Sequence, residues 1–281
     1  MSGTETQTQD ATGKRVVLHT RGIERKYGSI TAVDGVDIDI YAGEIMAIVG
    51  DNGAGKSTMI KMLCGAIQPD SGELYLEGQE GHVHLRSPHA ARALGIETVF
   101  QDLALAPNRD VVSNLFLGRE VYFGGLFSPL RILNTREMRR RAKEQLAELQ
   151  INLPGLSGFE LGQMSGGQRQ SVAIARAAFW ASRVLLMDEP TAALGVRESG
   201  AVLRLARSVA DAGVAVVMVS HVLPHVMELA DRVVVMRGGR KIAEITENIR
   251  QDRLISLIVG AEQQVYEQAL RGDTETAELL E

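Results

Sequence analysis

The chain has 281 residues, of which 45% are hydrophobic, 23% are charged and 4% are aromatic. The apolar fraction excludes wholesale disorder, and the length suits one globular domain with an insert. The single cysteine, Cys64, rules out a disulfide framework within the chain. The net charge of −5 disfavours a protein that holds nucleic acid over its whole surface.

Both ends of the chain are polar and rich in Thr, Gln and Glu, so we predict flexible tails over residues 1–14 and 263–281. The first of these has no apolar stretch of the kind found in secretory signals. No apolar run is long enough to cross a membrane as a helix, and the run at residues 214–219 is far too short. We therefore expect a cytosolic protein unless a partner docks it elsewhere.

Short apolar runs predict the strands of the core. They lie at residues 45–49, 184–187, 214–219 and 233–236. Runs of this length, each followed by glycine or a polar residue, are typical of strands covered on both faces. Helical patterns lie between them, which predicts an α/β core.

Residues 102–181 are mostly helical in pattern and predict a helical subdomain inserted in that core, with the chain returning to the core near Arg183. The clearest helix spans residues 134–150. Asn134 and Glu137 have the spacing of a capping box at its start. One face of this helix is apolar, at Met138, Ala142, Leu146 and Leu149.

A phosphate loop is predicted directly after the first apolar run, because residues 50–57 match the pattern GxxxxGK(S/T) and a helix is predicted at residues 57–63. The glycines let several backbone N–H groups point into one concavity, which binds β- and γ-phosphates. Lys56 adds a positive charge, and Ser57 supplies a hydroxyl for Mg²⁺. The alternative is an ordinary glycine-rich turn. The predicted nucleotide-binding residues here are Gly50, Asp51, Asn52, Gly53, Ala54, Gly55, Lys56, Ser57 and Thr58.

The second apolar run ends in two carboxylates, Asp188 and Glu189. A Mg²⁺-directing aspartate belongs at this edge of a parallel sheet, beside the phosphate loop. We predict that Asp188 holds the metal or its water and that Glu189 polarises the attacking water as general base. The alternative is a pair of solvated acids that open a turn before Pro190.

A second anion site is predicted at the start of an apolar-periodic helix over residues 169–181. Ser165 can cap that helix, and Gly166 and Gly167 expose backbone N–H groups at its start. The spacing does not say whether this site serves the same phosphate. The alternative is a plain glycine-containing helix cap.

Together these motifs resemble an ATP-binding-cassette (ABC) transporter ATPase subunit over residues 16–260. The segment Met-Ser-Gly-Gly-Gln at residues 164–168 resembles the family signature LSGGQ, with Met in place of Leu. Gln101 lies where the family has its Q-loop glutamine, His221 where it has its switch histidine, and Tyr27 where an aromatic ring stacks on adenine. Taken singly, the same residues suit a surface glutamine, a loop histidine and a core tyrosine.

The resemblance implies a P-loop NTPase core, which is a mostly parallel sheet with helices. It adds an N-terminal antiparallel β part and the inserted helical subdomain at about residues 102–181. The whole would form an ABC ATPase domain over residues 15–262.

The resemblance also implies ATP and Mg²⁺ as cofactors, and two cassettes that close head to tail around ATP. Glu189 and His221 are then the catalytic residues: Glu189 activates water, and His221 contacts the γ-phosphate. Gln101 links the metal site to the helical subdomain. The residues implied at the metal are Ser57, Gln101 and Asp188. The signature residues that would act in trans are Ser165, Gly166, Gly167 and Gln168.

One position departs from the family pattern. Most members have an Asp where this chain has Gly195, and that Asp contributes to contacts across the dimer. Segments around residues 101–105, 114–120 and 192–195 are similar to a bacterial subgroup that imports monosaccharides such as ribose, xylose or fructose. Many of that subgroup carry two fused cassettes, whereas this chain has one phosphate loop, which implies a single cassette working as a homodimer.

The first hypothesis is therefore an ATP-hydrolysing subunit that energises import of a small solute, a monosaccharide by subgroup likeness. It would lie peripherally on the cytoplasmic face of the bacterial inner membrane, served by separate permease subunits and indirectly by a solute-binding protein. The apolar-rich residues 103–127 are the candidate docking surface. The alternative is that these residues pack inside the helical subdomain.

Two other classes of function fit the sequence less well than a transport ATPase. Soluble ABC-type ATPases that act on nucleic acid or ribosomes need a second cassette or a long coiled coil, and this chain shows neither and is acidic. A nucleotide-binding regulator without turnover is disfavoured by the presence of Glu189 and His221. The remaining loop histidines have no Cys partner, which argues against zinc at His82, His84 and His89.

Overall fold

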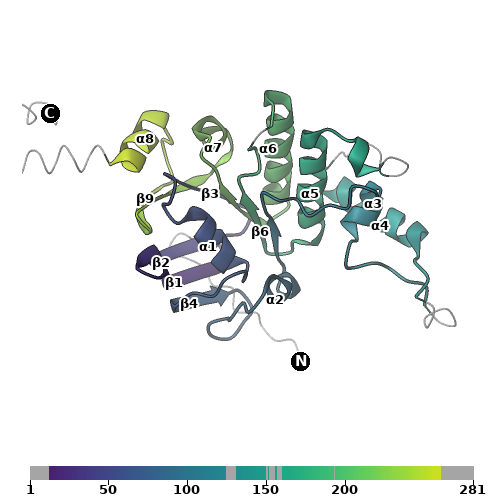
Figure 1. The fold of residues 1–281 in the computed structure, drawn as a ribbon, viewed down its shortest axis with the longest axis horizontal. Helices are drawn as coiled ribbons and strands as arrows, with labels where there is room; N and C mark the ends of the chain where they lie inside the picture. The colour runs from purple at the N-terminus through teal and green to yellow at the C-terminus, as the bar shows by residue number, and fades with distance from the viewer. Residues whose placement is uncertain are drawn as a thin grey trace, which may run out of the picture.

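The computed structural model describes residues 13–124, 131–149, 151, 156, 160–192 and 194–260. The tails predicted at residues 1–14 and 263–281 lie almost wholly outside these ranges, so the prediction of their flexibility stays untested. Figure 1 shows a central sheet with helices around it, a smaller sheet at its lower left and a group of helices at its right.

The larger sheet contains six strands in the order β5-β6-β7-β3-β8-β9, and each neighbouring pair is parallel except β8 and β9. The strands are β3 (Ile45–Gly50), β5 (Ile96–Val99), β6 (Val184–Asp188), β7 (Ala215–Val219), β8 (Arg232–Arg237) and β9 (Arg240–Ile245). The four predicted runs are confirmed as β3, β6, β7 and β8. The sequence did not reveal β5 and β9, because neither has a continuous apolar run: polar residues interrupt β5, and exposed residues alternate along β9.

Successive residues of the central strand β3 face two separate hydrophobic cores. Ile45, Ala47 and Val49 lie in a core shared with the helices on one side of the sheet. Met46 and Ile48 lie in the other core, which the smaller sheet covers. Because both faces are covered, the strand has no position for a polar side chain, and this explains its unbroken apolar sequence.

The smaller sheet confirms the implied antiparallel β part. It has the order β2-β1-β4, and both of its strand pairs are antiparallel. Helix α1 (Lys56–Leu63) contributes Met59, Ile60 and Leu63 to the core that lies between the two sheets. The chain leaves this layer through the short helix α2 (Pro88–Ala93) and enters β5. The strands of the smaller sheet are β1 (Val16–Tyr27), β2 (Ile30–Tyr41) and β4 (Ser71–Leu76).

The predicted helical segment forms the group at the right of Figure 1, which contains α3 (Val111–Leu115), α4 (Thr135–Glu148) and α5 (Gly166–Trp180). Asn134 caps α4 as predicted, since its side chain accepts from the backbone N–H of Glu137 at 3.0 Å. The capping box is incomplete, because the Glu137 carboxylate pairs with Arg140 and Arg141 instead of returning to the cap. The predicted apolar face of α4 is buried.

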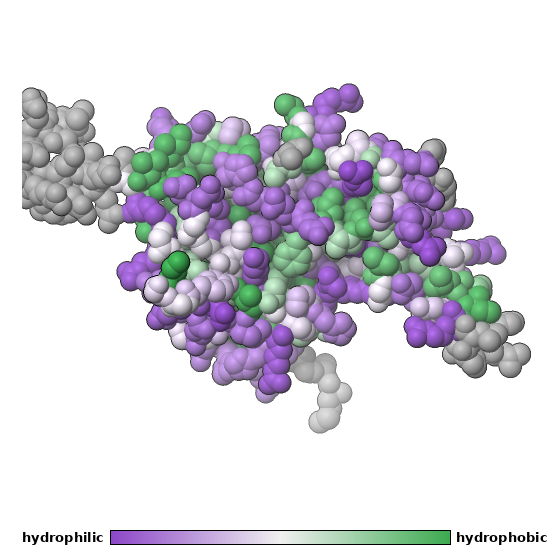
Figure 2. All heavy atoms as spheres, in the orientation of Figure 1, coloured by the Kyte–Doolittle hydropathy of each residue, from purple (hydrophilic) through white to green (hydrophobic). Residues whose placement is uncertain are grey.

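Three more helices complete the fold: α6 (Val196–Asp211), α7 (Leu223–Leu229) and α8 (Gln251–Val259). Apolar side chains gather on the surface over α7 and α8 (Figure 2). Helix α8 carries the exposed Ile255 and Val259. Elsewhere on this face polar and charged side chains predominate. Across the described ranges, the helices fall short of the length and apolar character that a membrane span requires.

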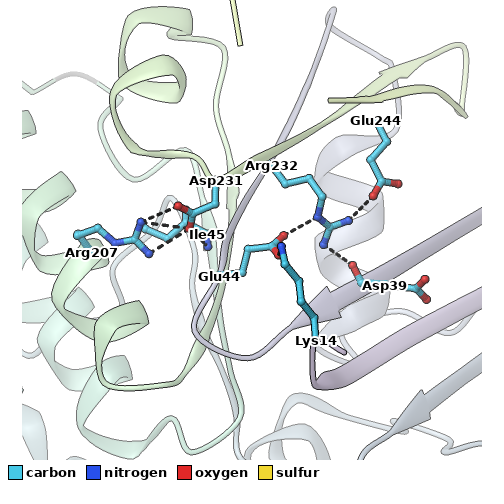
Figure 3. A network of polar contacts seen from close by, with 8 residues as sticks. All are labelled: Lys14, Asp39, Glu44, Ile45, Arg207, Asp231, Arg232 and Glu244. Carbon is cyan, nitrogen blue, oxygen red and sulfur yellow. Dashed lines mark hydrogen bonds and ion pairs between the residues drawn. The ribbon is translucent and has the colours of Figure 1, made fainter. Parts of the chain in front are cut away.

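A buried arginine joins the two sheets at the start of β8 (Figure 3). The Arg232 guanidinium, only 2% exposed, donates to the carboxylates of Glu44 and Glu244 at 2.5 and 2.7 Å and to the backbone oxygen of Asp39 at 2.5 Å. Lys14 reaches the second oxygen of the Glu44 carboxylate at 3.2 Å. Burial opposes the charged form of Arg232, but the hydrogen bonds and charges of Glu44 and Glu244 together outweigh it and raise the pKa of the guanidinium.

The neighbouring residue Asp231 anchors the first residue of β3. Its carboxylate accepts from the backbone N–H of Ile45 at 2.8 Å and from the guanidinium of Arg207 on α6 at 2.9 Å (Figure 3). The strand that precedes the phosphate loop is therefore tied at its start to β8 and to α6.

Replacing Arg232 by alanine leaves the Glu44 carboxylate buried without its main partner. We expect a loss of about 3–5 kcal/mol in the free energy of unfolding, measured by urea denaturation. Arg250→Ala is the matched control, because Arg250 and its partner Asp252 form an exposed pair. Equal losses in the two variants would show that the buried network does not stabilise the fold.

Candidate functional site

The predicted phosphate loop runs from the end of β3 to the start of α1. Gly55 caps α1 with φ of +99°, and a Cβ atom there would stand 2.2 Å from the backbone oxygen of Ala32. A Cβ atom on Gly50 would stand 2.1 Å from the backbone oxygen of Met236. Both positions accept only glycine, so the close packing against β2 and β8 gives the loop its shape.

Within this loop the side chains divide into buried anchors and exposed groups. Ala54 is buried in the core, and its backbone N–H donates to the backbone oxygen of Asp51 at 3.1 Å. The Lys56 ammonium curls back over the loop and donates to the backbone oxygens of Gly50 and Asp51, both at 2.9 Å. Exposed residues line the rest of the loop, namely Asp51, Asn52, Gly53 and Ser57.

Ser57 and Asp188 meet although 131 positions separate them in the sequence. The Ser57 hydroxyl lies 3.2 Å from Oδ1 of Asp188. Burial raises the pKa of Asp188, and the hydrogen bond from Ser57 opposes that rise. A hydroxyl and a carboxylate that lacks a full counter-charge fit Mg²⁺, which takes few protein oxygens and completes its shell with water and phosphate.

The predicted catalytic pair is also close. Nδ1 of His221, which follows β7, lies 2.6 Å from Oε2 of Glu189, which follows β6. Glu189 has φ of +53°, a left-handed backbone conformation that is uncommon for residues other than glycine, and its N–H donates to the backbone oxygen of Val219 at 3.0 Å. Such strained positions cluster at functional sites, where the surrounding structure holds them.

Gln101 follows a strand of the larger sheet, whereas Tyr27 ends a strand of the smaller sheet. Gln101 is exposed and follows β5, whose Val99 pairs with Met187 of β6, so the parallel register brings it to the same sheet edge as Glu189. Tyr27 ends β1 with 46% of its surface exposed, so its interpretation as a core residue is wrong. The guanidinium carbon of Arg25 lies 5.0 Å from the centre of the Tyr27 ring and covers one of its faces.

The segment predicted as a second anion site begins α5, three residues earlier than the sequence indicated. Ser165 and Gln168 form a full capping box: the Ser165 hydroxyl accepts from the Gln168 N–H at 3.2 Å, and the Gln168 side chain accepts from the Ser165 N–H at 2.9 Å. Among the described residues, no hydrogen bond joins this segment to the phosphate loop. Helix α5 packs into one hydrophobic core and helix α1 into the other, so the two predicted anion sites begin helices on opposite faces of the larger sheet.

The family model for ABC transporters matches residues 33–192, more than half of the chain. The chain belongs to the ABC transporter family. This cassette is 45% identical to the fructose import ATP-binding protein of Rhizobium meliloti, over 88% of this chain and 95% of that protein. It is 43% identical to the xylose/arabinose import ATP-binding protein of Sulfolobus acidocaldarius, over 80% and 86% of the two chains.

Longer relatives and solved structures agree with this assignment. A ribose import ATP-binding protein of Rubrobacter xylanophilus is 39% identical over 95% of the cassette, and the cassette spans about half of that protein's length (51%). A nucleotide-free ATP-binding cassette from an ABC transporter superposes with a TM-score of 0.73 at 27% identity, covering 86% of this chain and 95% of the other. The dimeric structure of a bacterial ABC transporter cassette gives 0.65 at 25% identity, covering 82% and 99%.

The structure corrects the docking surface expected at residues 103–127. Leu115 and Phe116 are fully buried in the core of the helical group, so packing inside the subdomain is the right interpretation for them. Leu117 and Phe123 remain exposed, and the end of the segment lies outside the described residues.

Two contacts of the cassette were not expected from the sequence. Nδ1 of His225 on α7 lies 3.0 Å from the hydroxyl of Thr191, which ties the turn after Glu189 to the helix that follows His221. The Glu198 side chain on α6 lies against Gly167. Only the position of Glu198 in the first turn of a helix, three residues after Gly195, could have drawn attention to it.

Gly167 is required by this contact, whereas Gly166 is not. A Cβ atom on Gly167 would stand 2.1 Å from Cγ of Glu198, while one on Gly166 would have no neighbour within 4 Å. We therefore expect Gly167→Ala to lower the free energy of unfolding by about 1–3 kcal/mol, as overpacking does, and Gly166→Ala to leave it nearly unchanged. Urea denaturation of both variants measures the difference, and similar stabilities would contradict the packing described.

Proposed function

We propose that this cassette hydrolyses ATP to energise the import of a monosaccharide through a separate membrane permease. The observation that carries the proposal is the common sheet edge at which the phosphate loop, the Ser57–Asp188 pair and the Glu189–His221 pair lie. A loop that grips phosphates beside a general base is what hydrolysis of ATP needs. The sugar follows from relatives named for fructose, xylose/arabinose and ribose import.

In this proposal the loop over residues 50–58 binds the phosphates of ATP through its backbone N–H groups and the N-terminus of α1. Lys56 turns from the backbone oxygens of the loop to the phosphates, and the open face of Tyr27 stacks on adenine. Mg²⁺, held by Ser57, Asp188 and Gln101, supplies positive charge to the phosphate oxygens when it is bound.

Glu189 takes the proton from the attacking water in this proposal. His221, which lies 2.6 Å from the Glu189 carboxylate, orients that carboxylate and donates to the γ-phosphate. In this proposal the left-handed backbone at Glu189 turns the carboxylate toward the water in front of the phosphate loop.

Two copies of the cassette are proposed to close head to tail on two ATP molecules. The separation of the signature segment from the phosphate loop within one chain supports this arrangement, because the capped start of α5 then serves the nucleotide of the other copy. Its donors would be the Ser165 hydroxyl, the N–H groups of the exposed Gly166 and the buried Gly167, and the Gln168 side chain. A related cassette is known as a dimer.

The permease is proposed to dock at a cleft of about 300 Å³ between β5 and the helical group. Arg119 is central to it: its guanidinium pairs with Glu97 at 2.6 Å and lies over the Trp180 ring at 4.7 Å. Burial raises the pKa of Glu97, and the Arg119 guanidinium opposes that rise. With Arg92 and Arg176 also lining it, the cleft suits an acidic segment with an apolar side that meets the exposed Leu117.

Docking of this kind would hold the cassette on the cytoplasmic face of the inner membrane as a peripheral subunit. A solute-binding protein would act on the other side of the permease without touching the cassette. The relatives named for sugar import give no support to the alternative function on nucleic acid or ribosomes.

Glu189→Gln is expected to keep ATP binding and to abolish steady-state hydrolysis, because an amide cannot accept the proton of water. Binding is measured with a fluorescent ATP analogue and turnover by phosphate release, both with Mg²⁺. Lys56→Glu is the contrasting variant and is expected to lose binding itself. Unchanged turnover in Glu189→Gln would remove Glu189 as the base, and unchanged binding in Lys56→Glu would refute the phosphate loop.

Leu117→Asp is expected to reduce binding to the permease encoded by the neighbouring genes, because it places a carboxylate on the apolar rim of the proposed cleft. Binding is measured in detergent with both proteins purified. Ile132→Asp, at a similarly exposed site of the helical group, is the control. ATP hydrolysis by the isolated cassette is expected to stay unchanged in both variants, and equal permease binding would rule out this docking surface.

A further inference from the structure

A carboxylate lies beside Gly195, the position at which most family members carry an aspartate. It belongs to Glu198, in the first turn of α6, and its Oε2 lies 2.6 Å from the point where a Cβ atom of residue 195 would stand. With C–C and C–O bonds of about 1.52 and 1.23 Å, the oxygens of an aspartate lie about 2.4 Å from its own Cβ. Glu198 therefore holds an oxygen at about the same distance from this point as an aspartate at position 195 would hold its own.

Gly167 allows the Glu198 side chain to take this path. A Cβ atom on Gly167 would stand 2.1 Å from Cγ and 2.5 Å from Cβ of Glu198. These two carbons lie next to the backbone of α6, so a change at the far end of the side chain would not relieve the clash. Two glycines, at positions 167 and 195, thus leave the space that one glutamate fills.

An acid in the first turn of a helix also interacts favourably with the helix dipole. That interaction needs no particular direction of the side chain and does not require the two glycines. The other ordinary role of a glutamate at this position is to accept from the backbone N–H of the N-cap residue, and the described residues show no such hydrogen bond from Gly195 to Glu198. The Glu198 side chain lies between Gly195 and the start of α5. This position indicates a role at the surface that these two segments share.

We propose that Glu198 supplies, from one helical turn further along the chain, the carboxylate that Gly195 lacks at the contact between two cassettes. The side chain is half-buried between Gly167 and Gly195, while Val196 beside it is 91% exposed, so the carboxylate lies at the boundary of the surface. There it accepts hydrogen bonds from the second copy, next to the signature turn that meets the nucleotide of that copy. The inference rests on the homodimer of the proposed function.

The test uses the full chain with Glu189→Gln as the parent, so that bound ATP is not consumed and closed pairs accumulate. Dimerisation with ATP and Mg²⁺ is measured by analytical ultracentrifugation over a range of protein concentrations. Adding Glu198→Ala is expected to weaken dimerisation about tenfold or more, because an acceptor at the interface is lost. Glu198→Gln keeps the packing over Gly167 and one acceptor oxygen but removes the charge that strengthens the hydrogen bonds, so it is expected to give a smaller loss in the same direction. Glu228→Ala, on the exposed face of α7, is the control.

Gly195→Asp provides the decisive comparison. Combined with Glu198→Ala it is expected to restore most of the dimerisation, because a Cβ atom at position 195 has no neighbour within 4 Å other than the Glu198 side chain. Alone it is expected to weaken dimerisation, since two carboxylates would then compete for one place.

The outcomes separate this inference from the proposed function. If Glu198→Ala dimerises like the parent, or if the double variant is no better than Glu198→Ala, the role of Glu198 is refuted while the homodimer stands. If the parent binds ATP and stays monomeric, the homodimer and the role of Glu198 are both refuted. Loss of dimerisation in a Glu198→Gln chain that melts like the parent and still binds ATP supports the inference.

Discussion

The parallel register of β3, β7 and β6 is the constraint on which the site depends. Residues that follow neighbouring parallel strands meet at one edge of the sheet. The phosphate loop follows β3, His221 follows β7, Asp188 ends β6 and Glu189 follows it. A slip of one residue between these strands would exchange the two faces of β3, which pack into two different cores. Burial of both faces therefore fixes the strand register, and the register brings the site residues together.

Glycine contributes to this site in two distinct ways. In the phosphate loop, Gly50 and Gly55 let the backbone pass close to neighbouring strands in conformations that other residues rarely adopt. At the start of α5, Gly167 has an ordinary conformation, and the absence of its side chain lets α6 approach. The first use shapes a binding loop, whereas the second aligns two helices whose N-termini lie side by side. Both uses reduce to a close approach of the backbone to another element.

Charge is distributed unevenly over the cassette. The chain is acidic overall, yet three arginines line the cleft between β5 and the helical group, and only one carboxylate faces them there. A local cationic surface on an acidic protein favours a specific acidic partner over broad attraction to polyanions. The net charge of the chain disfavours nucleic acid as a partner, but it does not show that a local cationic cleft exists where a partner could dock.

Local patterns in the sequence determined the four buried strands, the phosphate loop, the two carboxylates after β6 and the caps at Asn134 and Ser165. Each depends on residues a few positions apart, so the sequence alone predicts it. The tertiary structure alone decided that Leu115 and Phe116 are buried, that Arg232 joins the two sheets and that Glu198 reaches the space beside Gly195. These depend on which distant segments approach one another, and that approach follows from the packing of whole elements, which no short stretch of sequence encodes.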